Sequence, residues 1–147
     1  MTERAGVNDL GRFVAAQEGT YAAALAGLRG GAKRTHWMWF VFPQIAGLGH
    51  SPTAHHFAIR DIGEARALLG HEVLGARLRE ATGVTAAWAG RQTLPEIFGP
   101  VDALKFISCL TLFEAAAGTG GPPDFAIALA ALADGERDRH TLTLIAA

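Results

Sequence analysis

The chain has 147 residues, of which half are hydrophobic and 18% are charged, and its formal net charge is −1. This length suits one domain with a substantial hydrophobic core. The near-neutral charge excludes a general nucleic-acid binder, which needs an excess of lysine and arginine to neutralise phosphates. The single cysteine, Cys109, excludes an internal disulfide and a zinc site built on several cysteines. Neither a signal peptide nor an apolar run of about 18 residues is present, so we expect a cytoplasmic protein without a membrane helix.

The first expected element is one long helix. Residues 1–7 are expected to form a frayed tail, and Asn8 or Asp9 can cap a helix that runs to about Leu28 and ends at a glycine pair. Gln17 falls in the middle of the apolar face of this helix. A buried amide without partners costs about 1–3 kcal/mol. Gln17 is therefore either a structural hydrogen-bonding residue or an amide that lines a pocket.

An aromatic run at residues 37–42 follows the first helix. Its composition favours a strand, whereas its apolar spacing also fits a short helix. No other segment makes a convincing partner strand, so a helix or an irregular segment is favoured. Two cations, Lys33 and Arg34, precede the run. They either offset the dipole of the first helix or form an anion site that faces the aromatic residues.

The rest of the chain reads as a series of helices. We expect helices at residues 52–59, 61–70, 71–89, 103–117 and 124–133, a short turn at 93–99 and a short terminal segment at 142–145. The expected caps or starts are Ser51, Asp61, Thr93, Asp102, Asp124 and Asp138. The segment 103–117 is apolar on nearly all sides, which indicates a buried helix. The sequence thus predicts an all-α fold. Residues 1–147 would form one compact domain of about six to eight helices, an orthogonal-type bundle with a buried central helix.

The cations beside the aromatic run form the first constellation that could carry chemistry. Phosphate is bound by ammonium and guanidinium groups, and a base or nicotinamide ring stacks on a flat aromatic surface. Lys33 and Arg34 next to Trp37 and Trp39 therefore suit a nucleotide-like ligand. The alternative is that the aromatic residues belong to the core and the cations only end a helix.

Histidine and lysine give the remaining candidates. His36 is either a general base or a structural histidine. His50 and His55 could approach each other, but no further ligand accompanies them, so no metal site is predicted. Lys105 and Ser108 share a stripe on the central helix, without the strained turn of a nucleophilic serine; a buried lysine nevertheless needs a partner. No glycine-rich phosphate loop is present, and no cofactor is predicted.

Several motifs resemble one known family. They are Asp9-Leu10-x-Arg12-Phe13-x-x-Ala16-Gln17, His36-Trp-Met-Trp-Phe-x-Phe-Pro-Gln44, Gly47-Leu-Gly-x-Ser51, Glu64-Ala65, Ile97-Phe-Gly99, Asp102-x-Leu-Lys105 and Ser108-x-Leu-Thr-Leu-Phe113. Together they resemble the DUF1810 family of small bacterial proteins over residues 8–145. The resemblance implies an all-helical fold and no particular activity.

Two looser associations come with this family. Some of its members carry a calpastatin-like label, which the present chain does not support, because inhibitor chains of that type are long and disordered whereas this composition predicts a dense core. The chain also resembles the NADAR group of small helical proteins, which is linked to N-glycosidic bonds of nucleotide derivatives. That similarity rests on a small helical domain with aromatic-proline segments, without a residue-by-residue match.

Two hypotheses of function follow. In the first, the protein binds or hydrolyses a phosphorylated nucleotide-like small molecule, for example at an N-glycosidic bond. The candidate catalytic residues are His36 and Lys105, and the candidate binding residues are Gln17, Lys33, Arg34, Trp37, Trp39, Gln44, Ser51 and Ser108. In the second, the protein is a non-enzymatic helical module that binds a protein or self-associates. An exposed Trp37 or Trp39 in a flat patch would favour the second hypothesis.

Overall fold

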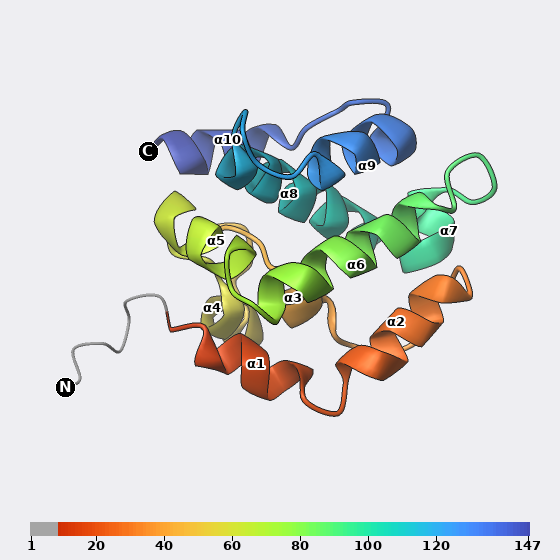
Figure 1. Ribbon diagram of the computed structural model, residues 1–147, viewed down its shortest axis with the longest axis horizontal. Helices are drawn as coiled ribbons and strands as arrows, with labels where there is room; N and C mark the ends of the chain where they lie inside the picture. The colour runs from red at the N-terminus through yellow and green to blue at the C-terminus, as the bar shows by residue number, and fades with distance from the viewer. Residues whose placement is uncertain (1–8) are drawn as a thin grey trace.

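The helix that the rest of the chain packs against is α8, Pro100–Ala117. In the computed structural model, which describes residues 9–147, its neighbours are α5 (Ile62–Leu69), α7 (Leu94–Phe98), α9 (Asp124–Ala133) and α10 (Arg139–Ala146) (Figure 1). Phe106, Cys109 and Phe113 are completely buried on this helix. The prediction of an all-helical domain with a buried central helix is therefore confirmed. The first turns of α8 nevertheless reach the surface at Val101 and Leu104.

The remaining helices are α1 (Gly11–Gln17), α2 (Tyr21–Arg29), α3 (Met38–Val41), α4 (Pro52–Phe57) and α6 (Leu74–Ala86). Of these, α3 also contacts α8, and α6 packs against α2, α5 and α9. In Figure 1 the long helix α6 crosses the front of the molecule, and α1 and α2 lie along its lower edge. The helices run in several directions instead of side by side, as expected for an orthogonal arrangement. Among these described helices, none is both long and apolar enough to cross a membrane.

The prediction of one long first helix was wrong. The chain forms α1 and α2 instead, separated by residues 18–20. Gly19 has a φ of 71° there, a left-handed conformation that a continuous helix does not contain and that glycine adopts at little cost. The N-cap of α1 is Leu10, without a side-chain cap. This break, together with a helical α3, gives ten helices over residues 9–147, against the six to eight expected. The predicted frayed tail, residues 1–7, lies outside the described residues.

Most of the predicted helix caps are confirmed. Ser51, Asp61, Thr93 and Asp138 each accept a hydrogen bond from a backbone N–H in the first turn of their helix. The prediction for Asp124 was wrong, because the N-cap of α9 is Pro123. Asp124 instead pairs with Arg79 of α6 at 3.1 Å, which ties two helices together. Asp102 lies in the first turn of α8, but the helix begins at Pro100, after Gly99.

The aromatic run forms the short helix α3 and its flanks, and it lies in the core. Trp37 is 2% exposed and Phe42 is completely buried. The Phe42 ring meets Phe98 and Phe106 edge-on, with centroids 6.0 and 4.8 Å apart. The strand alternative for residues 37–42 is not observed; in the described part of the chain only an isolated bridge joins Ile45 to Ile59. Core packing therefore fixes the position of α3, whose residues Met38, Trp39 and Phe40 line a cavity.

Candidate ligand-binding cavity

A cavity of about 290 Å³ opens where α3, the start of α4 and the start of α8 meet. Its lining residues are Lys33, His36, Trp37, Met38, Trp39, Phe40, Ser51, Thr53, Asp102 and Lys105. Six of the ten candidate residues from the sequence are among them, namely Lys33, His36, Trp37, Trp39, Ser51 and Lys105. Segments far apart in the chain thus bring cations, hydroxyls and aromatic rings to one place.

Asp102 joins the two lysines of the cavity. Its Oδ2 lies 2.9 Å from Nζ of Lys33, and its Oδ1 lies 3.2 Å from Nζ of Lys105. Burial raises the pKa of Asp102, but the hydrogen bonds from the two lysines outweigh this effect and hold the pKa below its ordinary value. The carboxylate is therefore ionised at neutral pH. Two ammonium groups and one carboxylate leave a net charge of +1 on the cluster.

Each ammonium group also lies over an indole ring. Nζ of Lys105 is 4.4 Å from the ring centroid of Trp39, and Nζ of Lys33 is 5.5 Å from that of Trp37. These distances are those of cation–π contacts, which stabilise the ammonium groups in addition to their ion pairs with Asp102. Trp37 is buried, whereas Trp39 is only partly buried. Trp39 is thus the ring that a ligand in the cavity can reach.

Gly49 allows the Trp39 ring to take its place in the cavity wall. A Cβ atom on this glycine would lie 2.8 Å from Cη2 of Trp39 and 2.5 Å from Cβ of Ala54. Both distances are shorter than any normal contact between carbon atoms. The absence of a side chain at position 49 is therefore a condition for the shape of the cavity.

The variant Gly49→Ala is expected to be less stable by about 1–3 kcal/mol, because the added methyl forces Trp39 or α4 to move. Urea denaturation followed by tryptophan fluorescence measures both the stability and the change around Trp39. Gly83→Ala is the matched control, since a Cβ there meets no atom within 4 Å and the residue lies inside α6. That control should gain about 0.5–1 kcal/mol. Equal stability of the two variants would contradict the close approach at Gly49.

Four candidate residues lie outside the cavity lining. Gln17 is buried and structural: its Nε2 donates to the Phe40 carbonyl at 2.8 Å, and its Oε1 accepts from Arg77 at 3.2 Å. Gln17 therefore supports the cavity from behind, through the backbone of α3. Gln44 is 4% exposed, and its Nε2 has no hydrogen-bond partner among residues 9–147. Arg34 is exposed and does not line the cavity.

Ser108, the fourth of these residues, holds the start of α10 in place. Its hydroxyl lies 2.9 Å from Oδ2 of Asp138, whose backbone N–H donates to Oγ1 of Thr111 at 3.0 Å. The same carboxylate caps α10 at Thr141. The polar stripe of α8 therefore divides: Lys105 faces the cavity, and Ser108 and Thr111 fix the C-terminal helix.

Asp138 should make stability depend on pH. Burial raises its pKa, but hydrogen bonds from Thr141 and Ser108 outweigh this and lower it. A lowered folded-state pKa gives a contribution that is present above the unfolded value of about 3.9 and is lost as the pH falls. We expect Asp138→Ala to lose about 1–2 kcal/mol at pH 7, and this loss should shrink below about pH 4. Denaturation at several pH values tests this, with exposed Glu136→Ala as the control; a loss that is constant with pH would contradict it.

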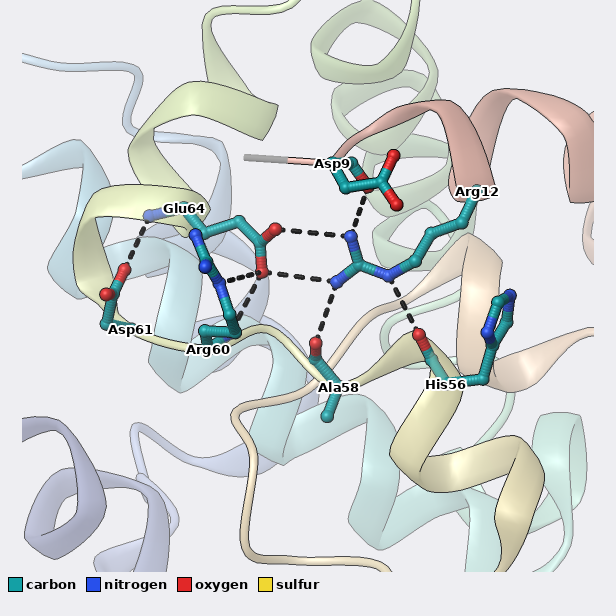
Figure 2. A network of polar contacts seen from close by, with 7 residues as sticks. All are labelled: Asp9, Arg12, His56, Ala58, Arg60, Asp61 and Glu64. Atoms are coloured by element: carbon teal, nitrogen blue, oxygen red, sulfur yellow. Dashed lines mark hydrogen bonds and ion pairs between the residues drawn. The ribbon is translucent and has the colours of Figure 1, made fainter. Parts of the chain in front are cut away.

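A second polar network, centred on Arg12 and Glu64, joins α1 to the segment between α4 and α5 (Figure 2). Nη1 and Nη2 of Arg12 each donate to one carboxylate oxygen of Glu64 at 3.2 Å. The same guanidinium donates to the carbonyls of His56 and Ala58, both at 2.8 Å, and to that of Asp9. Glu64 is 1% exposed and also accepts from the backbone N–H of Arg60 at 2.9 Å.

This Arg12–Glu64 clamp is structural. A guanidinium has five N–H donors, and all five are used by the acceptors in Figure 2. The surface hollow beside it, also lined by His55 and His56, therefore offers a ligand no free donor from Arg12. Both residues belong to the motifs of the family resemblance, but neither was predicted to be a site residue. In residues 9–147 no group of three His, Cys, Asp or Glu side chains is placed to hold a metal ion.

Asp102 was not predicted as a site residue, because a carboxylate near a helix start was interpreted as a cap. The spacing of Asp102 and Lys105 could have indicated this role. The two residues are three positions apart, and such residues are neighbours on a helix surface. Thr53 was missed as well. It lies on the same first turn of α4 as the predicted Ser51, and it lines the cavity.

The fold and the cavity define a small all-helical protein with a cationic, aromatic pocket. The family model described as "Protein of unknown function (DUF1810)" matches residues 7–145, and the chain belongs to this family. Among solved structures it is similar to the conserved hypothetical protein Rv1873 from Mycobacterium tuberculosis. The two chains are 46% identical with a TM-score of 0.89, over 95% of this chain and 97% of that chain. No curated protein matches the chain.

Proposed function

We propose that the cavity binds a small phosphorylated molecule with a flat ring, such as a nucleotide. The observation that carries this proposal is the pair of ammonium groups, Lys33 and Lys105, which share Asp102 and lie over the two indole rings of the cavity. Small-molecule sites usually measure about 300–1,000 Å³. The volume of about 290 Å³ is at the low end of this range and favours a ligand no larger than a mononucleotide.

Each part of the ligand has a counterpart in the cavity. The net charge of +1 on the lysine–aspartate cluster attracts an anion, and the ammonium groups keep donors for its oxygens, since each has three. The hydroxyls of Ser51 and Thr53 are available to a sugar or phosphate oxygen. Trp39 offers part of its ring to a base. This combination of charge and flat surface is what a nucleotide-like molecule requires.

The proposal includes hydrolysis of the ligand at an N-glycosidic bond. In this reaction water adds to the anomeric carbon of the sugar as the bond to the base breaks. The departing base needs a proton, which His36 or Lys105 can supply. The lowered pKa of Asp102 makes this carboxylate a poor general base, so its part is to hold the two ammonium groups in place.

A helical interaction module is the second candidate function. The observation in its favour is the exposure of Val101 and Leu104, which are 65% and 68% exposed on the first turns of α8. The tryptophans count against it, because Trp37 lies in the core and Trp39 lies in a concave wall instead of a flat patch. The small-molecule proposal therefore has the stronger support.

A thermal-shift screen against nucleoside monophosphates, NAD derivatives and ADP-ribose tests the proposal. A ligand present at 100 times its dissociation constant stabilises the folded state by about 2.7 kcal/mol, which is readily measured. We expect at least one nucleotide to raise the melting temperature, and the matching nucleoside without phosphate to raise it less. A well-folded protein that responds to none of these compounds would contradict the proposal. Incubation of each hit with the protein and chromatography of the products then tests for hydrolysis.

A further inference from the structure

The chain contains two lysines and eleven arginines, and both lysines line the same cavity. Arginine serves as the cation everywhere else in the sequence, including the buried clamp at Arg12. Arginine is also the better residue for binding phosphate in two parallel hydrogen bonds. A need for positive charge alone therefore does not account for lysine at both positions. The property that lysine has and arginine lacks is a side chain that can lose a proton and become a nucleophilic amine.

The geometry distinguishes the two lysines. Lys33 has the shorter contact to Asp102, 2.9 Å, and its side chain is 9% exposed. Lys105 has the longer contact, 3.2 Å, and its side chain is 25% exposed. Nζ of Lys105 is therefore the more accessible of the two amines, and Lys33 is the more firmly paired with Asp102.

We propose that Lys105 is an amine nucleophile that forms an imine with the carbonyl group of a small aldehyde or ketone, including the open-chain form of a sugar. The ammonium of Lys105 first loses its proton to solvent. Its Nζ lone pair then forms a bond to the carbonyl carbon, and the carbonyl π electrons move to the oxygen, which takes up a proton. The nitrogen of this carbinolamine loses a proton, the protonated hydroxyl leaves as water, and a C=N bond remains. The balance is one amine plus one carbonyl compound to one imine plus one water, without an oxidant or reductant.

The neighbouring groups have defined parts in this step. The ammonium of Lys33 stays paired with Asp102 and stabilises the negative charge that develops on the carbonyl oxygen. The cation–π contact with the ring of Trp39, 4.4 Å away, places Nζ of Lys105 at the cavity wall before the proton is lost. The inference uses the same cavity as the proposed function but requires neither a phosphate nor a base on the ligand.

Reductive trapping tests the inference. The intact protein is incubated with glycolaldehyde and sodium cyanoborohydride, which reduces an imine to a stable secondary amine, and the adduct is located by mass spectrometry. Nα-acetyllysine amide in the same mixture provides the rate of an ordinary lysine. We expect Lys105 to be modified at least about ten times faster than this standard. The reason is that the ammonium of Lys33 is already in place to stabilise the negative charge on the carbonyl oxygen. Modification of Lys105 at or below the rate of the standard, or faster modification of Lys33, would overturn the inference.

Charge-preserving variants provide the controls. Lys105→Arg keeps a cation in the cavity but removes the amine, so the fast adduct should disappear while the melting temperature stays within a few degrees of the wild type. Arg66→Lys is the matched control, because Arg66 is exposed and lies outside the cavity lining, and it should keep the fast adduct at Lys105. Nucleotide binding and trapping are both measured on the wild-type protein. Binding without trapping overturns only the imine, and trapping without binding overturns only the nucleotide ligand.

Discussion

Replacing Arg12 with methionine is expected to lower the free energy of unfolding by about 3–5 kcal/mol, the range for breaking a buried ion pair from one side. The cause is Glu64, which is 1% exposed and would lose both of its guanidinium donors. The carbonyls of His56 and Ala58 would lose their donors too. Urea denaturation at pH 7 measures the loss, and exposed Arg66→Met, which removes the same charge and the same type of side chain, is the control.

The second half of this test removes both partners. In the double variant Arg12→Met with Glu64→Leu no charge stays buried, and such replacements are often neutral. We expect the double variant to regain part, but not all, of the stability lost in the single variant, because the two backbone carbonyls still lack donors. A single variant within about 1 kcal/mol of the wild type would mean that the clamp is not a main support of the fold.

The Arg12–Glu64 clamp also supports the wall of the cavity. It holds the C-terminal end of α4 through the carbonyls of His56 and Ala58, whereas the first turn of α4 brings Ser51 and Thr53 to the cavity wall. Gln17 in α1 holds the backbone of α3 in a similar way, through the carbonyl of Phe40. The helix α1 thus supports two walls of the cavity without lining it.

The second large effect is expected at Lys105. The variant Lys105→Met removes one of two ammonium groups that can reach an anion and makes the lysine–aspartate cluster neutral. Hydrogen bonds to charged groups contribute about 1.5–3 kcal/mol. We therefore expect the affinity for the nucleotide found in the screen to fall about 10- to 100-fold. Isothermal titration calorimetry measures this fall.

Two controls limit the interpretation of that result. Arg66→Met makes the same change in net charge on an exposed face of α5, outside the cavity lining, and should leave the affinity unchanged. Lys105→Arg keeps the charge and should bind within about threefold of the wild type, because phosphate accepts from either cation. Equal affinities of Lys105→Met and the wild type would place the nucleotide outside this cavity.

The fold was largely predictable because its signals are local. Ser51, Asp61, Thr93 and Asp138 are cap residues that act within one turn, and each was found from the sequence. The break at Gly19 was missed because glycine inside a helical pattern is tolerated at a cost of only about 1 kcal/mol. The helical spacing of apolar residues therefore continues across Gly19 in the sequence, although the backbone changes direction there.

The site was predictable only in part, for a different reason. Lys33 and Trp37 lie four positions apart in one unusual stretch, so composition alone indicated them. Asp102 is unremarkable in sequence, and its role arises because α8 brings it to Lys33, 69 positions earlier in the chain. Ser108 was expected to share the site with Lys105. Ser108, however, lies one turn further along α8, where α10 packs, so its hydroxyl meets Asp138 instead of the cavity.

The central claim is that the cavity at Trp39 binds a nucleotide-like anion, and the three tryptophans of the chain allow a direct test. The indole N–H signals of ¹⁵N-labelled protein are followed by NMR while the nucleotide from the screen is added. We expect a saturable shift of the Trp39 signal with a dissociation constant of about 1 mM or lower. Trp88 should not move, because its Nε1 donates to the Leu28 carbonyl at 2.9 Å, outside the cavity lining. A shift of Trp88 with Trp39 unchanged, or no shift at any tryptophan, would contradict the claim.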